Sequence, residues 1–311
     1  MSVDYSEKIL TVKDLEVQFN LRGQVLTAIR GISLDIYKGE SLAIVGESGS
    51  GKSVFTKTFM GMLDKNGKVT KGEILYNGMD LAKFGSEKDW LKIRGKEVAM
   101  VFQDPMTSLN PLKTVGKQIQ EALELHQNLH GRAARERTIE ILSDVGITEP
   151  ERRYKQYPHE FSGGMRQRAV IATAIACNPN ILICDEPTTA LDVTIQAQII
   201  ELLEQLQKKY RLTIIYITHD LGVVAKVADR IAVMYAGDII EIGLCNEIFY
   251  NPQHPYTWAL LSSLPQLGIK GEPLYSIHGT PPNLFNEIKG DAFAPRNKHA
   301  LAIDFVAEPP R

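Results

Sequence analysis

The residues that could do chemistry are most concentrated at residues 46–53, which read Gly-Glu-Ser-Gly-Ser-Gly-Lys-Ser and fit the pattern G-x-x-x-x-G-K-[ST]. In this pattern glycines let backbone N–H groups turn toward phosphate oxygens, the lysine reaches the β- and γ-phosphates, and the last hydroxyl can ligate Mg²⁺. The apolar run 41–45 predicts a buried strand and residues 54–60 predict a helix, which is the context that the motif requires. We therefore expect a nucleoside triphosphate site rather than a glycine-rich surface turn. Its residues are Gly46, Glu47, Ser48, Gly49, Ser50, Gly51, Lys52 and Ser53.

Two acidic residues, Asp185 and Glu186, directly follow the apolar run 181–184, which predicts a second buried strand. In open parallel sheets, ligands bind beside the carboxyl ends of the strands. Asp185 would help to hold Mg²⁺ there, and Glu186 would orient or deprotonate an attacking water. Paired acids at a strand end are otherwise an ordinary surface feature, so this interpretation depends on the phosphate-binding loop upstream.

A third group, residues 161–168, places a serine and two glycines just before a predicted helix, which is a second anion-binding arrangement. The sequence Phe-Ser-Gly-Gly-Met resembles the signature motif of ABC-transporter ATPases, L-S-G-G-Q, with apolar exchanges at its first and fifth positions. The resemblance implies that Ser162, Gly163 and Gly164 cover the γ-phosphate of an ATP held by another subunit. It therefore implies a head-to-tail dimer with two ATP molecules at its interface.

Other positions match the remaining motifs of this family, and the match covers roughly residues 9–245. Gln103 matches a glutamine that ligates Mg²⁺ or water, and residues 190–192, with Asp192, match a loop that crosses the dimer interface. His219 matches a histidine that contacts the γ-phosphate. Phe19 matches an aromatic residue that stacks on adenine, with a core or edge phenylalanine as the alternative. The resemblance assigns catalysis to Lys52, Gln103, Glu186 and His219, and Mg²⁺ binding to Ser53, Gln103 and Asp185.

Two further segments resemble the oligopeptide/dipeptide importer branch of the family. They are residues 103–111 and residues 251–257, which read Asn-Pro-Gln-His-Pro-Tyr-Thr. The tail beyond them resembles one that in many relatives carries cysteines for a 4Fe–4S cluster, but Asp291, Asn297 and Asp304 occupy those positions. Because a cluster needs thiolate ligands, we predict that none is bound; a hard-metal site at the two aspartates is the alternative.

Composition excludes several classes of protein. The chain has 311 residues, with 35 Lys and Arg against 37 Asp and Glu, so no basic excess favours bulk nucleic-acid binding. The longest apolar run, residues 169–177, is too short to cross a bilayer, and the N-terminus lacks the pattern of an export signal. Cys177, Cys184 and Cys245 are an odd set that fits free thiols in a reducing cytoplasm. We expect a peripheral protein on the cytoplasmic face of the cell membrane, attached through partner chains.

The order of predicted elements indicates the fold class. Continuous apolar strands alternating with helices indicate an α/β fold with a mainly parallel core sheet, and alternating strands at residues 9–19 and 25–37 indicate an antiparallel β-subdomain. Together with the resemblance, this predicts a P-loop NTPase of the ABC ATPase type, with a helical subdomain at about residues 104–178. We expect an ATPase domain over residues 8–250 and an extension without cluster cysteines over residues 251–311.

The resemblance predicts an ATP-hydrolysing subunit that energises import of oligopeptides as part of a multi-subunit ABC transporter. The implied partners are a second, paralogous ABC ATPase in a heterodimer, two membrane-spanning permease subunits and an extracytoplasmic peptide-binding protein, with no nucleic acid. One alternative is a cargo of dipeptides, nickel or another small solute. A soluble ABC ATPase acting on nucleic acid or ribosomes is a second, which the near-neutral charge and the tail disfavour. A regulatory module without hydrolysis is a third, which the intact Lys52, Asp185, Glu186 and His219 disfavour.

Overall fold

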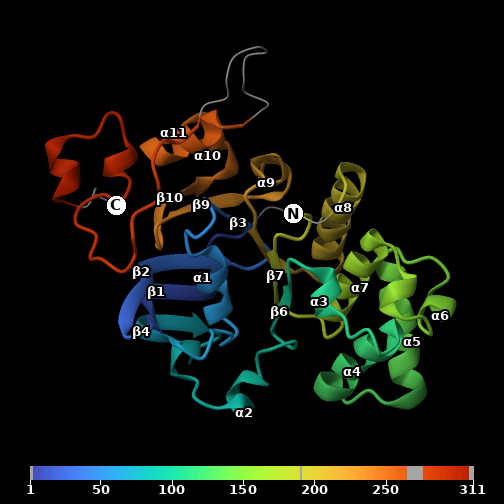
Figure 1. The fold of residues 1–311 in the computed structure, drawn as a ribbon. Helices are drawn as coiled ribbons and strands as arrows, with labels where there is room; N and C mark the ends of the chain where they lie inside the picture. Colours follow the sequence, from blue (N-terminus) through green and yellow to red (C-terminus); the bar gives the residue numbers. More distant parts are fainter. Residues whose placement is uncertain (1–2, 190, 265–275, 308–311) are drawn as a thin grey trace. The chain divides into compact units, whose positions relative to one another are not determined.

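The computed structural model describes residues 3–189, 191–264 and 276–307 (Figure 1). Contacts within the chain divide it into two compact units. The first unit contains residues 3–4, Lys38–Ser41 and Gly85–Tyr216. The second unit contains Tyr5–Tyr37, Leu42–Phe84 and the described residues from Ile217 onward.

The second unit contains an antiparallel sheet with the strand order β2-β1-β4-β5. Its strands are β1 (Lys8–Leu21), β2 (Gln24–Tyr37), β4 (Gly67–Tyr76) and the short β5 (Met79–Asp80). Along β1, Leu10 and Val12 are buried and then Leu15 and Val17, because a register shift after Val12 inserts an extra residue between the two pairs. The predicted antiparallel β-subdomain is therefore confirmed.

A second group of strands in this unit leads to the phosphate-binding loop. β3 (Ser41–Val45) runs parallel to β9 (Arg230–Tyr235), which turns at residues 236–237 into the antiparallel β10 (Asp238–Leu244). Every residue of β3 is buried, as its continuous apolar sequence indicates. Helix α1 (Lys52–Thr58) begins at the last two residues of the motif, Lys52 and Ser53. The strand, loop and helix that the motif requires are thus all present.

The first unit contains buried parallel strands and most of the long helices. β6 (Val98–Val101) pairs in parallel with β7 (Ile181–Asp185), and β8 (Thr213–Ile217) lies on the other side of β7. The helices of this unit are α2 (Glu87–Trp90), α3 (Pro105–Ser108), α4 (Val115–Gln127), α5 (Gly131–Asp144), α6 (Pro150–Arg153), α7 (Gly163–Ile175) and α8 (Val193–Tyr210). α7 contacts β6 as well as α4 and α5, so it links the strands of this unit to its helices.

Helix α8 forms as the sequence predicts. Asp192 caps its N-terminus, because the Asp192 Oδ1 accepts a hydrogen bond of 3.0 Å from the Ile195 N–H. Ile199, Leu203 and Leu206 recur at helical spacing and are all buried, so one stripe of the helix packs inside the unit.

The extension after residue 250 has more regular structure than its sequence indicates. Helix α10 (Cys245–Tyr250) ends where the extension begins, and the extension itself contains helix α11 (Pro255–Ser262) and the 3₁₀ turns η4 (Ala294–Arg296) and η5 (Ala302–Phe305). α11 is only about two turns long, which is too short for a recurring apolar stripe to be recognised.

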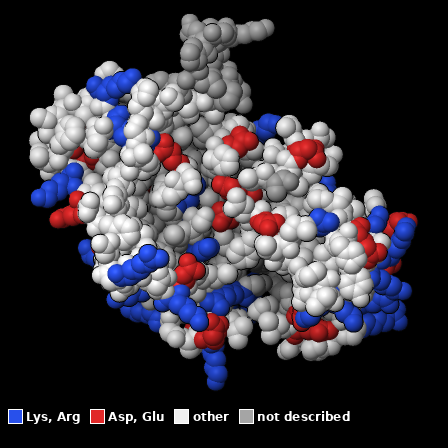
Figure 2. All heavy atoms as spheres, viewed as in Figure 1, with Lys and Arg blue, Asp and Glu red and all other residues white. Residues whose placement is uncertain are grey.

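Charge and hydropathy of the described residues agree with the composition. On the face shown in Figure 2, acidic and basic side chains are interspersed with uncharged ones, without one sign of charge covering it. Among the residues with assigned structure, no helix combines the length and apolar character needed to cross a membrane.

The packing of α8 generates a stability prediction. Leu203 is fully buried, so Leu203→Ala should leave a cavity and lower the free energy of unfolding by about 2–5 kcal/mol. Lys208→Ala on the exposed side of the same helix should change it by less than about 0.5 kcal/mol. Urea unfolding of the full chain, followed by circular dichroism, measures both. Equal stability of the two variants would show that this stripe does not pack as described.

Candidate functional site

The phosphate-binding loop, residues 46–53, has a backbone shape that glycine makes possible. Gly46 and Gly51 have φ angles of 151° and 103°. A Cβ on Gly46 would overlap the Met234 carbonyl oxygen, and a Cβ on Gly51 would lie 3.0 Å from the Ala28 carbonyl oxygen. The Gly237 N–H also donates a 2.9 Å hydrogen bond to the Ser50 carbonyl. The loop is therefore packed closely against β2 and the β9–β10 turn, with no room for a side chain at Gly46 and a tight fit at Gly51.

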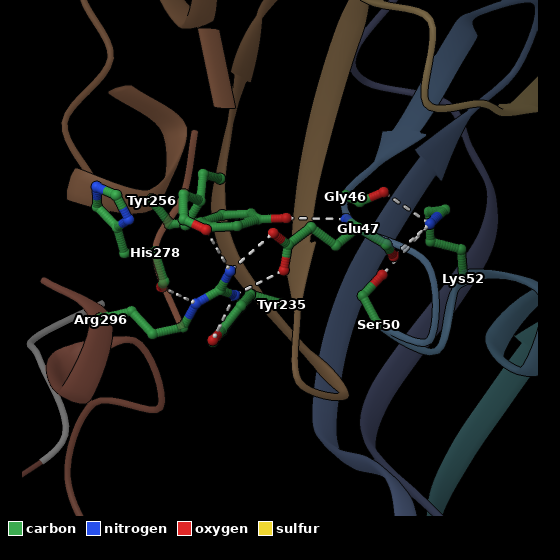
Figure 3. Close-up of polar contacts among 9 residues, drawn as sticks. Gly46, Glu47, Ser50, Lys52, Tyr235, Tyr256, His278 and Arg296 are labelled. Atoms are coloured by element: carbon green, nitrogen blue, oxygen red, sulfur yellow. Dashed lines mark hydrogen bonds and ion pairs between the residues drawn. The ribbon is translucent and has the colours of Figure 1, made fainter. Parts of the chain in front are cut away.

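Lys52 points back into the curve of this loop (Figure 3). Its Nζ donates hydrogen bonds of 2.8 Å to the carbonyl oxygens of Gly46 and Glu47, and one of 3.5 Å to the Ser50 hydroxyl. Lys52 is only 7% exposed, so the loop oxygens compensate for much of the lost hydration of its charge. Three carbonyl and hydroxyl oxygens thus hold one positive charge where the motif expects a phosphate to bind.

His219 and Phe19 are the other predicted site residues of the second unit. His219 is exposed and lies two residues after the end of β8. The preceding Thr218 N–H donates a hydrogen bond of 3.4 Å to the carbonyl of Ile44 in β3, so this segment runs beside the strand that enters the loop. Phe19 lies on β1 and is 9% exposed, with its ring directly over Gly67. Its role as an adenine-stacking residue stays a prediction beside the alternative of a packed sheet phenylalanine.

Glu186 and Gln103 are brought together in the first unit, although 83 residues separate them. The Gln103 Nε2 donates a hydrogen bond of 2.8 Å to the Glu186 Oε2. Gln103 follows β6 and Glu186 follows β7, and because these strands are parallel their carboxyl ends share one edge. Glu186 also has a φ of 47°, a region that non-glycine residues rarely adopt and that is found more often at functional sites.

Sequence reasoning assigned no role to Thr189, whose Oγ1 donates a 3.0 Å hydrogen bond to the Glu186 Oε2. Together with Gln103 it fixes the orientation of this carboxylate. The only sequence signal for this contact is that Thr189 lies three residues after Glu186. Asp185 ends β7 and is 9% exposed, so its carboxylate stands close to the buried strand beside Glu186.

The segment that resembles the signature motif forms the N-terminus of α7. The Ser162 hydroxyl caps the helix by accepting a 3.3 Å hydrogen bond from the Met165 N–H. Gly163 and Gly164 form its first turn, where N–H groups lack partners within the helix. Ser162 and Gly163 are exposed, so the positive end of the helix dipole is open to an anion from outside. Ala190 of the predicted segment 190–192 lies outside the described residues.

Each side chain predicted to bind Mg²⁺ is of a type that this ion accepts. Ser53, Gln103 and Asp185 offer hydroxyl, amide and carboxylate oxygens, which are the hard ligands that Mg²⁺ prefers. Within the described part of the chain, no three His, Cys, Asp or Glu side chains gather into a group that could hold a metal ion alone. A Mg²⁺ ion bound with a nucleotide does not need such a group, because phosphate oxygens and water supply the other ligands.

The three positions that correspond to cluster cysteines lie together in the second unit. Asp291, Asn297 and Asp304 line a cavity of about 590 Å³. Burial alone would raise the pKa of Asp291, but the His254 imidazole, 3.8 Å away, and a 2.9 Å hydrogen bond from the Phe293 N–H hold it below its usual value. A carboxylate held ionised by such partners has no thiolate chemistry to offer an iron–sulfur cluster.

Comparison with known proteins agrees with this geometry. Residues 29–189 match the ABC transporter family, and residues 240–303 match the oligopeptide/dipeptide transporter C-terminal region. The chain is 59% identical over 303 residues to the oligopeptide transport ATP-binding protein AmiE of Streptococcus pneumoniae, covering 97% of this chain and 85% of the relative. It is 56% identical over 305 residues to the dipeptide transport ATP-binding protein DppD of Lactococcus lactis, covering 98% and 87%.

Solved structures show the same fold. The ATP-binding cassette MJ0796, determined as a dimer in a post-hydrolysis state bound to ADP and Pi, superimposes with a TM-score of 0.68 at 28% identity, covering 76% of this chain and 98% of that chain. CbiO1 of Clostridium perfringens, part of an ABC transporter complex, superimposes with a TM-score of 0.68 at 31% identity, covering 79% and 92%. The chain therefore belongs to the ABC transporter ATP-binding family, in the branch that carries the oligopeptide/dipeptide transporter C-terminal region.

Proposed function

We propose that this chain is the ATP-hydrolysing subunit that energises import of oligopeptides by a multi-subunit ABC transporter. The observation that carries the proposal is the Lys52 ammonium held inside the glycine loop, since this is a phosphate-binding geometry. The carboxylate of Glu186, oriented by Gln103 and Thr189, adds a group that can act on water. The cargo rests on the 59% identity to an oligopeptide transport relative, while the 56% identity to a dipeptide transport relative supports dipeptides as the second candidate.

The proposed mechanism assigns each step to residues of this chain. The loop N–H groups, Lys52 and the start of α1 bind the phosphates, and Ser53 with Asp185 would hold Mg²⁺, which neutralises phosphate charge when bound. Glu186 accepts the proton of the attacking water or fixes its orientation for in-line attack. His219 contacts the γ-phosphate, and Gln103 would bind Mg²⁺ together with Ser53 and Asp185, or bind water.

The exposed N-terminus of α7 supports the proposal that two ATPase subunits face each other. In such a dimer Ser162, Gly163 and Gly164 cap the ATP of the partner, and Asp192 lies at the interface. ATP binding then favours the closed pair and hydrolysis releases it, because the closed state makes contacts to the γ-phosphate that the open state lacks. We place the pair, formed with a paralogous ATPase, on the cytoplasmic face of the membrane beneath two permease subunits that receive peptides from an extracytoplasmic binding protein.

Removal of the Lys52 ammonium tests the nucleotide site. Lys52→Ala should reduce ATP hydrolysis by the assembled transporter about 10²–10³-fold, because the lysine provides charge stabilisation that no neighbour replaces. Lys57→Ala, in the same helix α1, is the matched control and should keep normal hydrolysis. Phosphate release and ATP-driven uptake measure the effect. Uptake by Lys52→Ala at the rate of the control would show that ATP is bound elsewhere.

A second variant separates binding from hydrolysis. Glu186→Gln should bind MgATP normally but hydrolyse it about 10²–10⁴-fold more slowly, because the amide cannot accept a proton from water. The variant should accumulate as a closed dimer with ATP, detectable by gel filtration. Glu201→Gln, an exposed position on α8, is the control. Turnover like that of Glu201→Gln would remove Glu186 from this role.

The assembly is tested by purifying the tagged chain from its native membranes in mild detergent and identifying the proteins that accompany it. We expect two polytopic membrane proteins and a second P-loop ATPase. Competition of labelled oligopeptide uptake by unlabelled dipeptides and longer peptides then ranks the two cargo classes. Recovery of ribosomal or DNA-bound proteins, with no membrane protein, would contradict the transport function.

A further inference from the structure

The extension after residue 250 contacts the phosphate-binding loop directly through Arg296 (Figure 3). Arg296 ends the 3₁₀ turn η4, and its side chain is only 5% exposed. The five N–H groups of its guanidinium each have an acceptor: the two carboxylate oxygens of Glu47, the Tyr235 hydroxyl, and the carbonyl oxygens of His278 and Ile277. A buried arginine with all donors satisfied has one fixed position.

The contact between Arg296 and Glu47 is a bidentate ion pair. The two hydrogen bonds, of 2.7 Å and 3.0 Å, join both terminal guanidinium nitrogens of Arg296 to the two carboxylate oxygens of Glu47. Such paired, charge-assisted hydrogen bonds define the orientation of both groups as well as their distance. The hydrogen bond to Glu47 is also the main reason that the pKa of Arg296 is raised further above its usual value.

The backbone of Glu47 is held by a second residue of the extension. The Glu47 N–H donates a 2.8 Å hydrogen bond to the hydroxyl of Tyr256, which is fully buried in α11. The ring of Tyr256 packs against Tyr235 at 4.6 Å and against Phe293 at 5.3 Å between centroids. The rings of Tyr235, Tyr256 and Phe293 therefore pack against one another and hold the Tyr256 hydroxyl in place.

Glu47 connects this aromatic cluster to Lys52. Its carbonyl oxygen accepts hydrogen bonds from the Lys52 Nζ at 2.8 Å and from the Ser50 N–H at 3.2 Å. Residues of the extension therefore hydrogen-bond to the carboxylate and N–H of Glu47, while Lys52 and Ser50 of the loop donate hydrogen bonds to its carbonyl oxygen. Any rotation of the Glu47 backbone would move its carbonyl oxygen, which accepts a hydrogen bond from the Lys52 ammonium.

We propose that Arg296 and Tyr256 are positioning residues for ATP binding, and that the extension holds the first turn of the phosphate-binding loop in its binding shape. The proposal rests on the proposed ATP site. A loop that is already ordered loses less conformational entropy when phosphates bind, so its affinity is higher than that of a mobile loop. In the rival explanation, the ion pair only anchors the extension, and the loop keeps its shape without it.

The test is equilibrium binding of MgATP to the full chain, measured by calorimetry under conditions without turnover. Arg296→Gln and Glu47→Gln should each weaken binding about tenfold, a coupling of ordinary size between two sites. The double variant should bind no more weakly than the weaker single variant, because either change already breaks the pair. Thermal unfolding of each variant shows whether its fold is retained.

Two more variants test the geometry. Tyr256→Phe keeps the aromatic ring and removes only the acceptor for the Glu47 N–H, so it should weaken MgATP binding with little loss of thermal stability. Arg296→Lys keeps the charge but cannot form a bidentate pair, so it should restore only part of the affinity lost in Arg296→Gln. In the assembled transporter these variants should raise the KM for ATP and leave kcat nearly unchanged.

The controls separate this proposal from the ATP site itself. Trp258→Phe removes a hydrogen bond within the extension, from the Trp258 Nε1 to the Pro252 carbonyl, and should bind MgATP like the wild type. Lys52→Ala should bind far more weakly. If Arg296→Gln, Glu47→Gln and Tyr256→Phe all bind like the wild type while Lys52→Ala does not, the positioning role is wrong and the ATP site stands. If neither the wild type nor Lys52→Ala binds MgATP, both the proposed ATP site and the positioning role are wrong.

Discussion

The ammonium group of Lys52 is the constraint on which the phosphate-binding loop depends. A charge that is almost fully buried needs oxygen partners, and here the carbonyls of Gly46 and Glu47 supply them at 2.8 Å each. These carbonyls can converge on one nitrogen only if the chain curls sharply between them. Glycine at 46 and 51 makes that curl possible, because both residues have a positive φ that side chains disfavour, and a Cβ on Gly46 would also overlap the Met234 carbonyl oxygen.

The position of the Glu186 carboxylate depends on a different constraint, the parallel direction of β6 and β7. Because the strands run the same way, the residues that follow them emerge on one edge, and Gln103 and Glu186 meet there. The unusual backbone of Glu186 and the hydroxyl of Thr189 then fix where its carboxylate points. A group oriented in advance can act on water without further rearrangement at the moment of reaction.

If Arg296 and Tyr256 position the loop as proposed, the extension forms part of the nucleotide site. Its aromatic cluster places a hydroxyl and a guanidinium against one residue of the loop, on which the lysine also depends. Asp291, Asn297 and Asp304, the positions where the resemblance would place cluster cysteines, line a cavity of the same unit. The contacts of the described extension with the loop are hydrogen bonds and the ion pair of Arg296 with Glu47.

The sequence determined the local elements and the family. The buried strand β3, the cap at Asp192 and the helix after the loop follow from patterns within a few residues, because helices and strands repeat at short periods. It also predicted the antiparallel sheet and the α/β fold class. Tertiary structure alone decided that Gln103 meets Glu186 across 83 residues of sequence, and that Arg296 meets Glu47 across 249 residues. No local period encodes such a pair, because the packing of Tyr235, Tyr256 and Phe293 from distant segments sets its position.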